Sequence, residues 1–298
     1  MKKISIILSF ILSAVTLMTL TGCIRPETVV KDMDGYTLYE SLHYGKRERQ
    51  ELDLAIPDGA SGEIGLMLAI HGGGWRSGDK SGHSSDVEEW CKKGYVSAAI
   101  NYRYSTAHRV GVDEMLEDIT AALETIKESC AEVGVEVNKV MLYGGSAGAH
   151  LSLLYSYKIG KDAPIAPVAV CSLSGPTDLC DRKYFDNNPL VDDIIKMFSD
   201  LVDYKFDADS IDGAIPHLEY ASPISYIDGA VPTVICQGEL DIVVPASNGY
   251  TLDALLAEAG VSHDLIIFEN SGHGLEADPD RWALMKAKMT EYAERYLK

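Results

Sequence analysis

The sequence has no cluster of basic residues, and its charge is strongly of one sign. Its 298 residues include 26 Lys and Arg against 45 Asp and Glu, which gives a formal net charge of −19. A chain without a basic patch has nothing to pair with a phosphate backbone, which argues against nucleic acid as a partner. A repeat of roughly 20 to 50 residues is also lacking, which argues against solenoid and propeller folds.

Cysteine is scarce, and its spacing argues against two common kinds of site. The six cysteines include no Cys-x-x-Cys pair, so neither a structural zinc site nor a dithiol redox motif is indicated. Cys171 and Cys236 lie in apolar runs, where a free thiol packs as a small hydrophobic group. The one disulfide that the sequence offers as a candidate is Cys171–Cys180.

The chain does have an N-terminus of the kind that directs export. Two lysines precede an apolar stretch from Ile4 to Leu20, which ends in Leu20-Thr21-Gly22-Cys23. The pattern is typical of a secretory signal peptide. Its end resembles the lipobox of bacterial lipoproteins, in which the cysteine receives a lipid and becomes the mature N-terminus. An uncleaved membrane anchor is the alternative, although the apolar stretch is short for a full span.

This N-terminus sets the expected organisation of the chain. Residues 1–22 are predicted to be a lipoprotein signal peptide, Cys23 the lipidation site, and residues 23–34 a polar tether. The protein is therefore expected to be exported and anchored in a membrane of the bacterial cell envelope. Residues 35–298 remain for one folded domain, and 46% hydrophobic residues suffice for a sizeable core.

Short apolar runs alternate with amphipathic stretches of helical spacing along this domain. The predicted strands are 52–56, 65–70, 96–100, 139–143, 168–173, 231–236 and 263–268. The predicted helices are 84–93, 113–133, 147–157, 247–258 and 279–297. Such alternation predicts the α/β class, with a mostly parallel sheet and helices on both faces. Residues 178–222 interrupt this alternation of strands and helices. They are predicted to form a small cap, with a helix over 190–201.

A candidate nucleophile lies in Gly144-Gly145-Ser146-Ala147-Gly148, which fits the pattern G-x-S-x-G. In this motif the serine occupies a strained turn between a strand and a helix, and the glycines leave room for neighbouring backbone. An apolar run precedes the motif and a helical stretch follows it, which supports this reading over an ordinary glycine turn. The start of that helix directs backbone N–H groups at charge developing near Ser146.

A second glycine-rich segment, His71-Gly72-Gly73-Gly74-Trp75, follows the strand predicted at 65–70. Bare backbone N–H groups there can stabilise a developing oxyanion. The predicted donors are the N–H groups of Gly73, Gly74 and Ala147. His71 is assigned to holding the loop, and Trp75 to lining the acyl or leaving-group pocket, with plain packing as its alternative role.

The remaining members of a catalytic triad are predicted at the ends of two later strands. Asp241 follows the strand at 231–236, and His273 follows the strand at 263–268. The chain order serine, acid, histidine is that of G-x-S-x-G hydrolases. Sites of parallel sheets form where strands end, so His273 would take the proton of Ser146 while Asp241 orients the imidazole.

Three rivals for these roles are open in the sequence. Glu239 could replace Asp241, but it comes earlier in the turn. Asp178 also follows a strand, yet it precedes the insertion. His150 lies one helical turn after the nucleophile, where it would point along the helix, so packing or hydrogen bonding is the expected role. The other histidines lack a surrounding motif.

With these motifs in place, the chain resembles the bifunctional feruloyl and acetyl-xylan esterase-like family, related to hormone-sensitive-lipase-like esterases. The similar segments are 71–80, 144–150, Asn101-Tyr102-Arg103-Tyr104, Ala221-Ser222-Pro223 and Val243-Val244-Pro245. The resemblance covers roughly residues 35–298 and implies the α/β-hydrolase fold. It also implies catalytic roles for Ser146, Asp241 and His273, no metal or organic cofactor, and an ion pair between Arg103 and Asp118. Gln237 departs from the histidine frequent at its position.

The expected function is therefore hydrolysis of carboxylic esters outside the cytoplasm, through the triad and an acyl-enzyme. The expected enzyme is an esterase of the acetyl or feruloyl type that acts on acylated carbohydrates or small esters. An amidase or formamidase would use the same triad, although export makes an intracellular metabolite a poor substrate. A lipase would need a strongly apolar lid, whereas residues 178–222 are acidic. The non-catalytic alternative is a surface lipoprotein that only binds glycans. An excess of Tyr over Phe, 16 to 5, suits a wet, sugar-facing surface.

Overall fold

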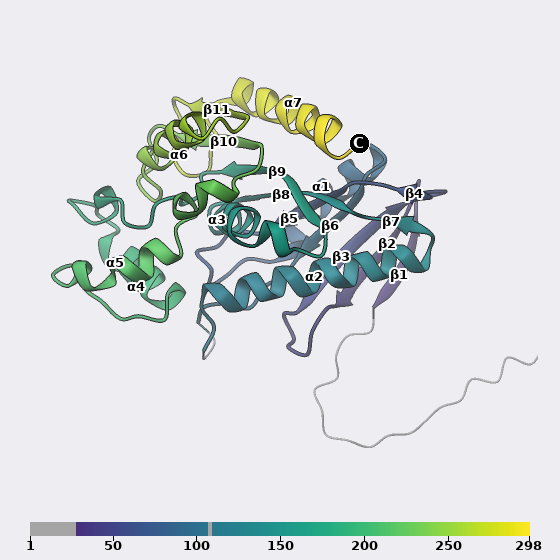
Figure 1. Cartoon of the computed structure of the whole chain (residues 1–298), viewed down its shortest axis with the longest axis horizontal. Helices are drawn as coiled ribbons and strands as arrows, with labels where there is room; N and C mark the ends of the chain where they lie inside the picture. The colour runs from purple at the N-terminus through teal and green to yellow at the C-terminus, as the bar shows by residue number, and fades with distance from the viewer. Residues whose placement is uncertain (1–27, 107–108) are drawn as a thin grey trace, which may run out of the picture.

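A computed structural model describes residues 28–106 and 109–298, and its centre is one large sheet (Figure 1). The strands of this sheet follow the order β1-β2-β3-β6-β5-β8-β9-β10-β11. Their bounds are β1 Val29–Met33, β2 Tyr36–His43, β3 Glu51–Pro57, β6 Val96–Ile100, β5 Leu66–Ile70, β8 Lys139–Gly145, β9 Ala166–Leu173, β10 Thr233–Gly238 and β11 His263–Phe268. Pairing is antiparallel from β1 to β6 and parallel from β6 to β11. Two short strands, β4 (Gly62–Glu63) and β7 (Val135–Glu136), pair separately.

Helices cover both faces of the sheet, as strand–helix alternation predicted. The α-helices are α1 Ser84–Lys92, α2 Val112–Glu132, α3 Ala147–Leu154, α4 Val191–Leu201, α5 Ile211–Tyr220, α6 Ser247–Glu258 and α7 Pro279–Tyr296. Shorter helical turns are η1 Lys80–His83, η2 Tyr155–Ile159, η3 Gly160–Asp162, η4 Arg182–Tyr184 and η5 Pro223–Gly229. The architecture is that of an α/β-hydrolase, and the predicted fold class is confirmed.

The two faces of the sheet have separate cores because side chains alternate along each strand. In β5, Leu66, Leu68 and Ile70 pack with α2, α3 and α6, whereas Met67 and Ala69 pack with α1 and α7. All five are fully buried. A strand that is covered on both faces has a continuously apolar sequence. For this reason, these strands could be recognised in the sequence.

The predicted helix over 113–133 is observed as α2, and its sequence explains its bounds. Its buried positions recur at helical spacing, which gives it one apolar face. The apolar ones are Val112, Met115, Leu116, Ile119, Ala122, Leu123, Ile126 and Cys130, and Asp118 is the buried acidic residue among them. At its start, the Glu114 carboxylate accepts a hydrogen bond from the Gly111 N–H at 2.8 Å, which satisfies a donor that the helix cannot.

The predicted tether over residues 23–34 is wrong for its last part. Val29–Met33 forms β1, which pairs with β2 in an antiparallel hairpin where Met33 faces Tyr36. The turn between them is Asp34-Gly35, and Gly35 has a φ of +89°. Asp-Gly is a strong signal for such a two-residue turn. The residues of β1 are all exposed, so no apolar alternation marked the strand in the sequence.

Residues 178–222, predicted as a cap, hold η4, α4 and α5. Figure 1 shows α4 and α5 at the opposite end of the view from β1 and β2. The inner side of α4 is apolar, and Ile194, Ile195 and Phe198 are buried. The helix α5 was not predicted because Pro216 lies inside it, and proline is normally excluded from helix interiors.

The candidate disulfide Cys171–Cys180 is not formed. All five cysteines in the described part of the chain are free thiols. Cys171 and Cys236 are fully buried on neighbouring strands β9 and β10, as small hydrophobic groups. Cys23 and the predicted signal peptide lie outside the described residues. Within the ranges that the structure describes, no helix has the length and apolar character needed to span a membrane.

Candidate active site

Ser146 occupies a strained turn between β8 and α3, with φ +54° and ψ −121°. The glycines at positions 144 and 148 are required because a side chain at either position would clash with neighbouring backbone. A Cβ on Gly144 would lie 2.3 Å from the Ile70 carbonyl oxygen, and one on Gly148 would lie 2.0 Å from the same atom. A side chain on Gly144 would therefore push β8 away from β5, and one on Gly148 would push α3 away from the end of β5. This crowding accounts for the G-x-S-x-G pattern around the half-buried serine.

The predicted triad partners meet at this turn. The Ser146 hydroxyl lies 2.9 Å from His273 Nε2, and His273 Nδ1 lies 2.7 Å from Asp241 Oδ2. The other oxygen of Asp241 accepts the N–H groups of Val243 at 2.8 Å and Val244 at 2.9 Å. These distances confirm the predicted geometry. Because Asp241 is buried and bonded to three nitrogen atoms, it fixes the imidazole with Nε2 toward the hydroxyl.

The rival acids lie elsewhere in the structure. Glu239 accepts a hydrogen bond from the Tyr250 hydroxyl at 2.6 Å on the exposed side of the turn. Asp178 accepts the Cys180 N–H at 2.9 Å, and burial raises the pKa of its carboxyl. Asp241 is therefore the acid that the fold brings to His273.

The loop predicted to hold the oxyanion donors reaches the same cavity as Ser146 and His273. Gly73 has a φ of +111° and Gly74 a φ of +59°, conformations that favour glycine. A Cβ on Gly73 would lie 2.3 Å from the Ser77 carbonyl oxygen. Gly73 and Gly74 line the cavity together with Ser146 and His273, and Ala147 follows Ser146 at the start of α3. Their role as donors stays a prediction.

His71 holds this loop, as the sequence indicated. Its Nδ1 lies 2.7 Å from the Gly72 carbonyl oxygen, and its Nε2 lies 3.1 Å from Arg49 Nη2. The ring also stacks on Tyr102, with centroids 4.3 Å apart. Burial lowers the pKa of His71 to about 4, and the neighbouring Arg49 guanidinium adds to that effect. Arg49, which also donates to the Gly78 carbonyl at 3.2 Å, was not identified from the sequence.

His150 connects the glycine-rich loop at residues 71–75 with Ala221 at the end of the cap. Trp75 Nε1 donates to His150 Nδ1 at 3.2 Å, and His150 Nε2 lies 2.7 Å from the Ala221 carbonyl oxygen. His150 is fully buried, and burial lowers its pKa to about 4. The neutral ring with its proton on Nε2 satisfies both partners. The packing and hydrogen-bonding role expected for His150 is confirmed.

The cavity at Ser146 has a volume of about 350 Å³ and is lined mainly by apolar side chains. Its lining residues are Gly73, Gly74, Trp75, Ser146, Pro176, Tyr184, Ile194, Met197, Phe198, Val243, Val244 and His273. Two of the lining aromatic side chains carry a polar atom, and both atoms are already bonded: Trp75 Nε1 to His150, and Tyr184 OH to Asn248 Oδ1 at 3.3 Å. Trp75 thus both packs and lines the cavity.

The ion pair between Arg103 and Asp118 is present. Arg103 Nε lies 2.9 Å from both carboxylate oxygens of Asp118, and the Arg103 N–H donates to Oδ2 at 2.8 Å. Asp118 is fully buried, and Gln50 donates to it at 2.8 Å. The predicted pairing is confirmed, with the charge of Asp118 fully satisfied by donors.

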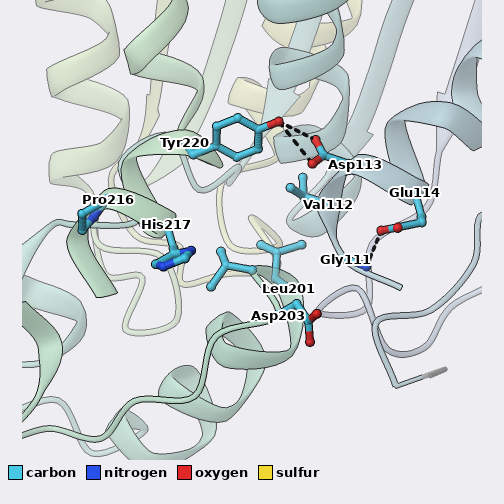
Figure 2. A pocket seen from close by; sticks show the side chains of 10 residues that line it. Gly111, Val112, Asp113, Glu114, Leu201, Asp203, Pro216, His217 and Tyr220 are labelled. Atoms are coloured by element: carbon cyan, nitrogen blue, oxygen red, sulfur yellow. Dashed lines mark hydrogen bonds between the residues drawn. The ribbon is translucent and has the colours of Figure 1, made fainter. Parts of the chain in front are cut away.

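A separate hollow lies where the cap meets the start of α2 (Figure 2). Figure 2 shows Tyr220 of α5 pointing to Asp113, and its hydroxyl lies 3.0 and 3.1 Å from the two carboxylate oxygens. Lys158 lies 3.3 Å from the centroid of the Tyr220 ring. None of the predicted site residues lines this hollow, so we regard it as the contact between cap and body.

The described ranges contain no candidate metal site. Over residues 28–106 and 109–298, no group of three or more His, Cys, Asp or Glu side chains is arranged to hold a metal ion.

Stability should fall at mildly acidic pH because of His71 and His150. Their folded pKa of about 4 lies below the ordinary 6.5, so the unfolded chain gains protons first as pH drops through 6.5. The stabilisation is complete above that value and is lost toward pH 4. At pH 5 the loss is about 2 kcal/mol for each histidine, at about 1.4 kcal/mol per unit.

The matched variant is His150→Gln, whose side-chain amide can still donate to Ala221 and accept from Trp75. Urea unfolding at pH 7 and pH 5 should show a fall in the wild type that exceeds the fall in the variant by about 2 kcal/mol. Equal falls in the two proteins would contradict the buried neutral state of His150.

Comparison with known proteins finds one family model and several proteins named as esterases that resemble this chain. The BD-FAE family model matches residues 52–256. Esterase LipQ of Mycobacterium tuberculosis is 27% identical over 238 residues, which are 74% of this chain and 53% of LipQ. A probable isoprenylcysteine alpha-carbonyl methylesterase of Arabidopsis thaliana is 28% identical over 112 residues, 38% of this chain and 23% of that protein. The chain thus spans about half the length of one relative and a quarter of the other.

Among solved structures, a truncated carbohydrate esterase from gut microbiota superposes with a TM-score of 0.70 at 20% identity. The match covers 89% of this chain and all of that one.

Proposed function

This chain belongs to the BD-FAE family of α/β-hydrolases, and we propose that it is a serine carboxylic-ester hydrolase. The observation that supports the proposal most is the run of hydrogen bonds from Ser146 through His273 to Asp241, at 2.9 and 2.7 Å. A hydroxyl bonded to an imidazole, which is itself oriented by a carboxylate, is the arrangement of an activated nucleophile.

In the proposed reaction, Ser146 Oγ attacks the ester carbonyl while His273 Nε2 accepts the hydroxyl proton. The N–H groups of Gly73, Gly74 and Ala147 would stabilise the resulting oxyanion. Collapse of the tetrahedral intermediate passes the proton from His273 to the leaving alcohol and leaves an acyl group on Ser146. Water activated by the same imidazole then releases the acid, and Asp241 stabilises the imidazolium in both halves.

We propose that the acyl half of the ester occupies the cavity of about 350 Å³ beneath α4. This volume is near the lower end of small-molecule sites, so it suits an acyl group better than a whole saccharide. The side chain of His273 is 28% exposed, which leaves an outlet for the alcohol. A carbohydrate or small alcohol would lie on that side. The carbohydrate esterase among the structural neighbours is consistent with this substrate class.

The cavity should select acyl groups without polar substituents. Because Trp75 Nε1 and Tyr184 OH are already bonded, a hydroxyl on the acyl group would lose its water without gaining a partner. We expect kcat/KM for methyl cinnamate to exceed that for methyl ferulate by about tenfold, which is about 1.4 kcal/mol. Equal values would show that the acyl site holds a polar partner, whereas inactivity on all esters would refute the proposed function.

A matched pair of variants tests whether α4 limits acyl length. Met197 lines the cavity, whereas the adjacent Lys196 is exposed. Met197→Ala should raise the octanoate-to-acetate ratio of kcat/KM, measured with p-nitrophenyl esters, by at least about threefold. This corresponds to at least about 0.6 kcal/mol and follows from the added space. Lys196→Ala should leave the ratio unchanged, and an identical change in both variants would contradict the assignment.

We further propose that the protein is exported and anchored by a lipid on Cys23. The support is the Leu20-Thr21-Gly22-Cys23 sequence after an apolar stretch. Globomycin should leave the signal peptide uncleaved, whereas Cys23→Ser should prevent lipid attachment, and the serine variant should leave the membrane fraction. Unchanged fractionation of the serine variant would indicate an uncleaved apolar anchor instead.

A further inference from the structure

The N–H groups of Gly73 and Gly74 are predicted oxyanion donors, and each shares a planar trans peptide with the carbonyl before it. Donor and carbonyl point in opposite directions, so whatever holds the carbonyl aims the N–H. The Gly73 carbonyl accepts hydrogen bonds from the backbone N–H groups of Arg76 and Ser77, both at 3.1 Å, and from the Ser77 hydroxyl at 2.9 Å. The Gly74 N–H is therefore aimed by the turn to which it belongs.

The Gly72 carbonyl, which aims the Gly73 N–H, is held by a side chain instead. His71 Nδ1 lies 2.7 Å from this oxygen. Gly78 passes so close that a Cβ there would lie 2.3 Å from the Gly72 oxygen and 2.5 Å from His71 Nδ1. Gly72 also packs against the nucleophile turn, since a Cβ on it would lie 3.5 Å from Ser146 Cβ. A rotation of this peptide would therefore move the Gly73 N–H relative to Ser146.

The position of the hydrogen on His71 decides whether this contact is a hydrogen bond. Nδ1 bonds to the carbonyl only when it carries a hydrogen, because a bare nitrogen would set its lone pair against the oxygen. Arg49 Nη2 lies 3.1 Å from His71 Nε2. A guanidinium only donates, so Nε2 must accept and the hydrogen must lie on Nδ1. Burial lowers the pKa of His71 to about 4, so the ring is neutral at pH 7.

Arg49 is itself held firmly in place. Its Nε donates to the Tyr102 carbonyl at 3.1 Å, and its Nη2 also donates to the Gly78 carbonyl at 3.2 Å. The central carbon of the guanidinium lies 3.7 Å from the centroid of the Tyr104 ring, which restrains the plane of the group. The guanidinium is thus already oriented to present Nη2 to His71.

We propose that Arg49 is a positioning residue of the esterase reaction, which fixes the tautomer of His71 and, through it, the aim of the Gly73 N–H. This inference rests on the proposed function. Arg49 does not line the cavity at Ser146, so it acts through the loop and not on the ester itself. Loss of an oxyanion donor typically costs about 10²–10³-fold in kcat, and a donor that is present but poorly aimed should cost less.

The tautomer can be observed directly in the wild type. Nitrogen-15 NMR of protein labelled in histidine, with the His71→Asn variant used to assign the signal, should show a neutral His71 ring at pH 7 with its hydrogen on Nδ1. A hydrogen on Nε2, or a charged ring, would overturn the proposal. This measurement decides even if a variant at Arg49 does not fold.

A double-mutant cycle then tests whether Arg49 acts through His71. Arg49→Met should lower kcat and kcat/KM for p-nitrophenyl acetate by the same factor of about ten, because the interaction is realised in the transition state. His71→Asn keeps an amide donor near the position of Nδ1 and has no tautomer to fix. In that background Arg49→Met should lower kcat by at most about threefold, through its other contacts. Equal losses in both backgrounds would overturn the proposal.

The matched control is Arg47→Met, which removes a positive charge two residues earlier at an exposed position. It should leave kcat and KM within about twofold of the wild type, because surface charges contribute little. Folding of each variant should be checked by circular dichroism. A wild type that hydrolyses no ester would refute the proposed function, whereas an active wild type whose kcat is unchanged by Arg49→Met would refute this inference alone.

Discussion

Ser146→Ala should lower kcat for p-nitrophenyl esters by at least about 10³-fold, because it removes the atom that forms the acyl-enzyme. The residual rate should reflect only binding and the oxyanion donors. Alanine fits the space of serine, so the turn between β8 and α3 should persist. The measurement is steady-state kinetics on protein whose folding has been checked by circular dichroism and thermal unfolding.

A control is available on the helix that follows this turn. Ser152 lies on α3 and donates to the Gly148 carbonyl at 2.7 Å, away from His273. Ser152→Ala should keep kcat within about threefold of the wild type, since no reacting atom is lost. If Ser146→Ala retained near-wild-type activity while folded, the nucleophile would have to be another group.

Asp241→Asn should be similarly severe, with a loss in kcat of about 10⁴-fold by analogy with other serine hydrolase triads. The oxygen that accepts the Val243 and Val244 N–H groups would be kept by the amide oxygen. The amide nitrogen would then face His273 Nδ1 as a donor. This arrangement forces the imidazole proton onto Nε2, the atom that must accept from Ser146.

The matched control is Glu239→Gln, two residues earlier in the same turn. Glu239 bonds to Tyr250 on the exposed side, so this change should leave kcat/KM within about twofold. If the two amide variants had equal activities, Asp241 would not be the orienting acid. The comparison therefore separates the role of one carboxylate from the general effect of removing charge at this turn.

The parallel part of the sheet could be predicted because its strands are buried on both faces. Runs such as Leu66–Ile70 are continuously apolar, and the glycines around Ser146 mark the turn between β8 and α3. The antiparallel strands at the edge of the sheet were harder to recognise in the sequence. β1 is fully exposed and β2 is mostly half-buried, so neither carries a clear apolar pattern, and the Asp34-Gly35 turn is the signal that could have revealed them.

The triad residues could be predicted because chemistry restricts both their type and their order along the chain. The lining of the catalytic cavity could not. Residues 178–222 are acidic on average, yet Asp192 and Asp193 of α4 face solvent while Ile194 and Phe198 face the cavity. Average composition conceals an amphipathic helix. Arg49 was missed because its contact with His71 spans separate loops.

The central claim is that Ser146 is a nucleophile activated by His273 and Asp241. The most direct test is covalent labelling with a fluorophosphonate, followed by mass spectrometry of the intact protein and its peptides. The account predicts one adduct per chain, on the peptide that contains Ser146, with no adduct in Ser146→Ala and much slower labelling in Asp241→Asn. Labelling at another residue, or none in a folded and active protein, would contradict it.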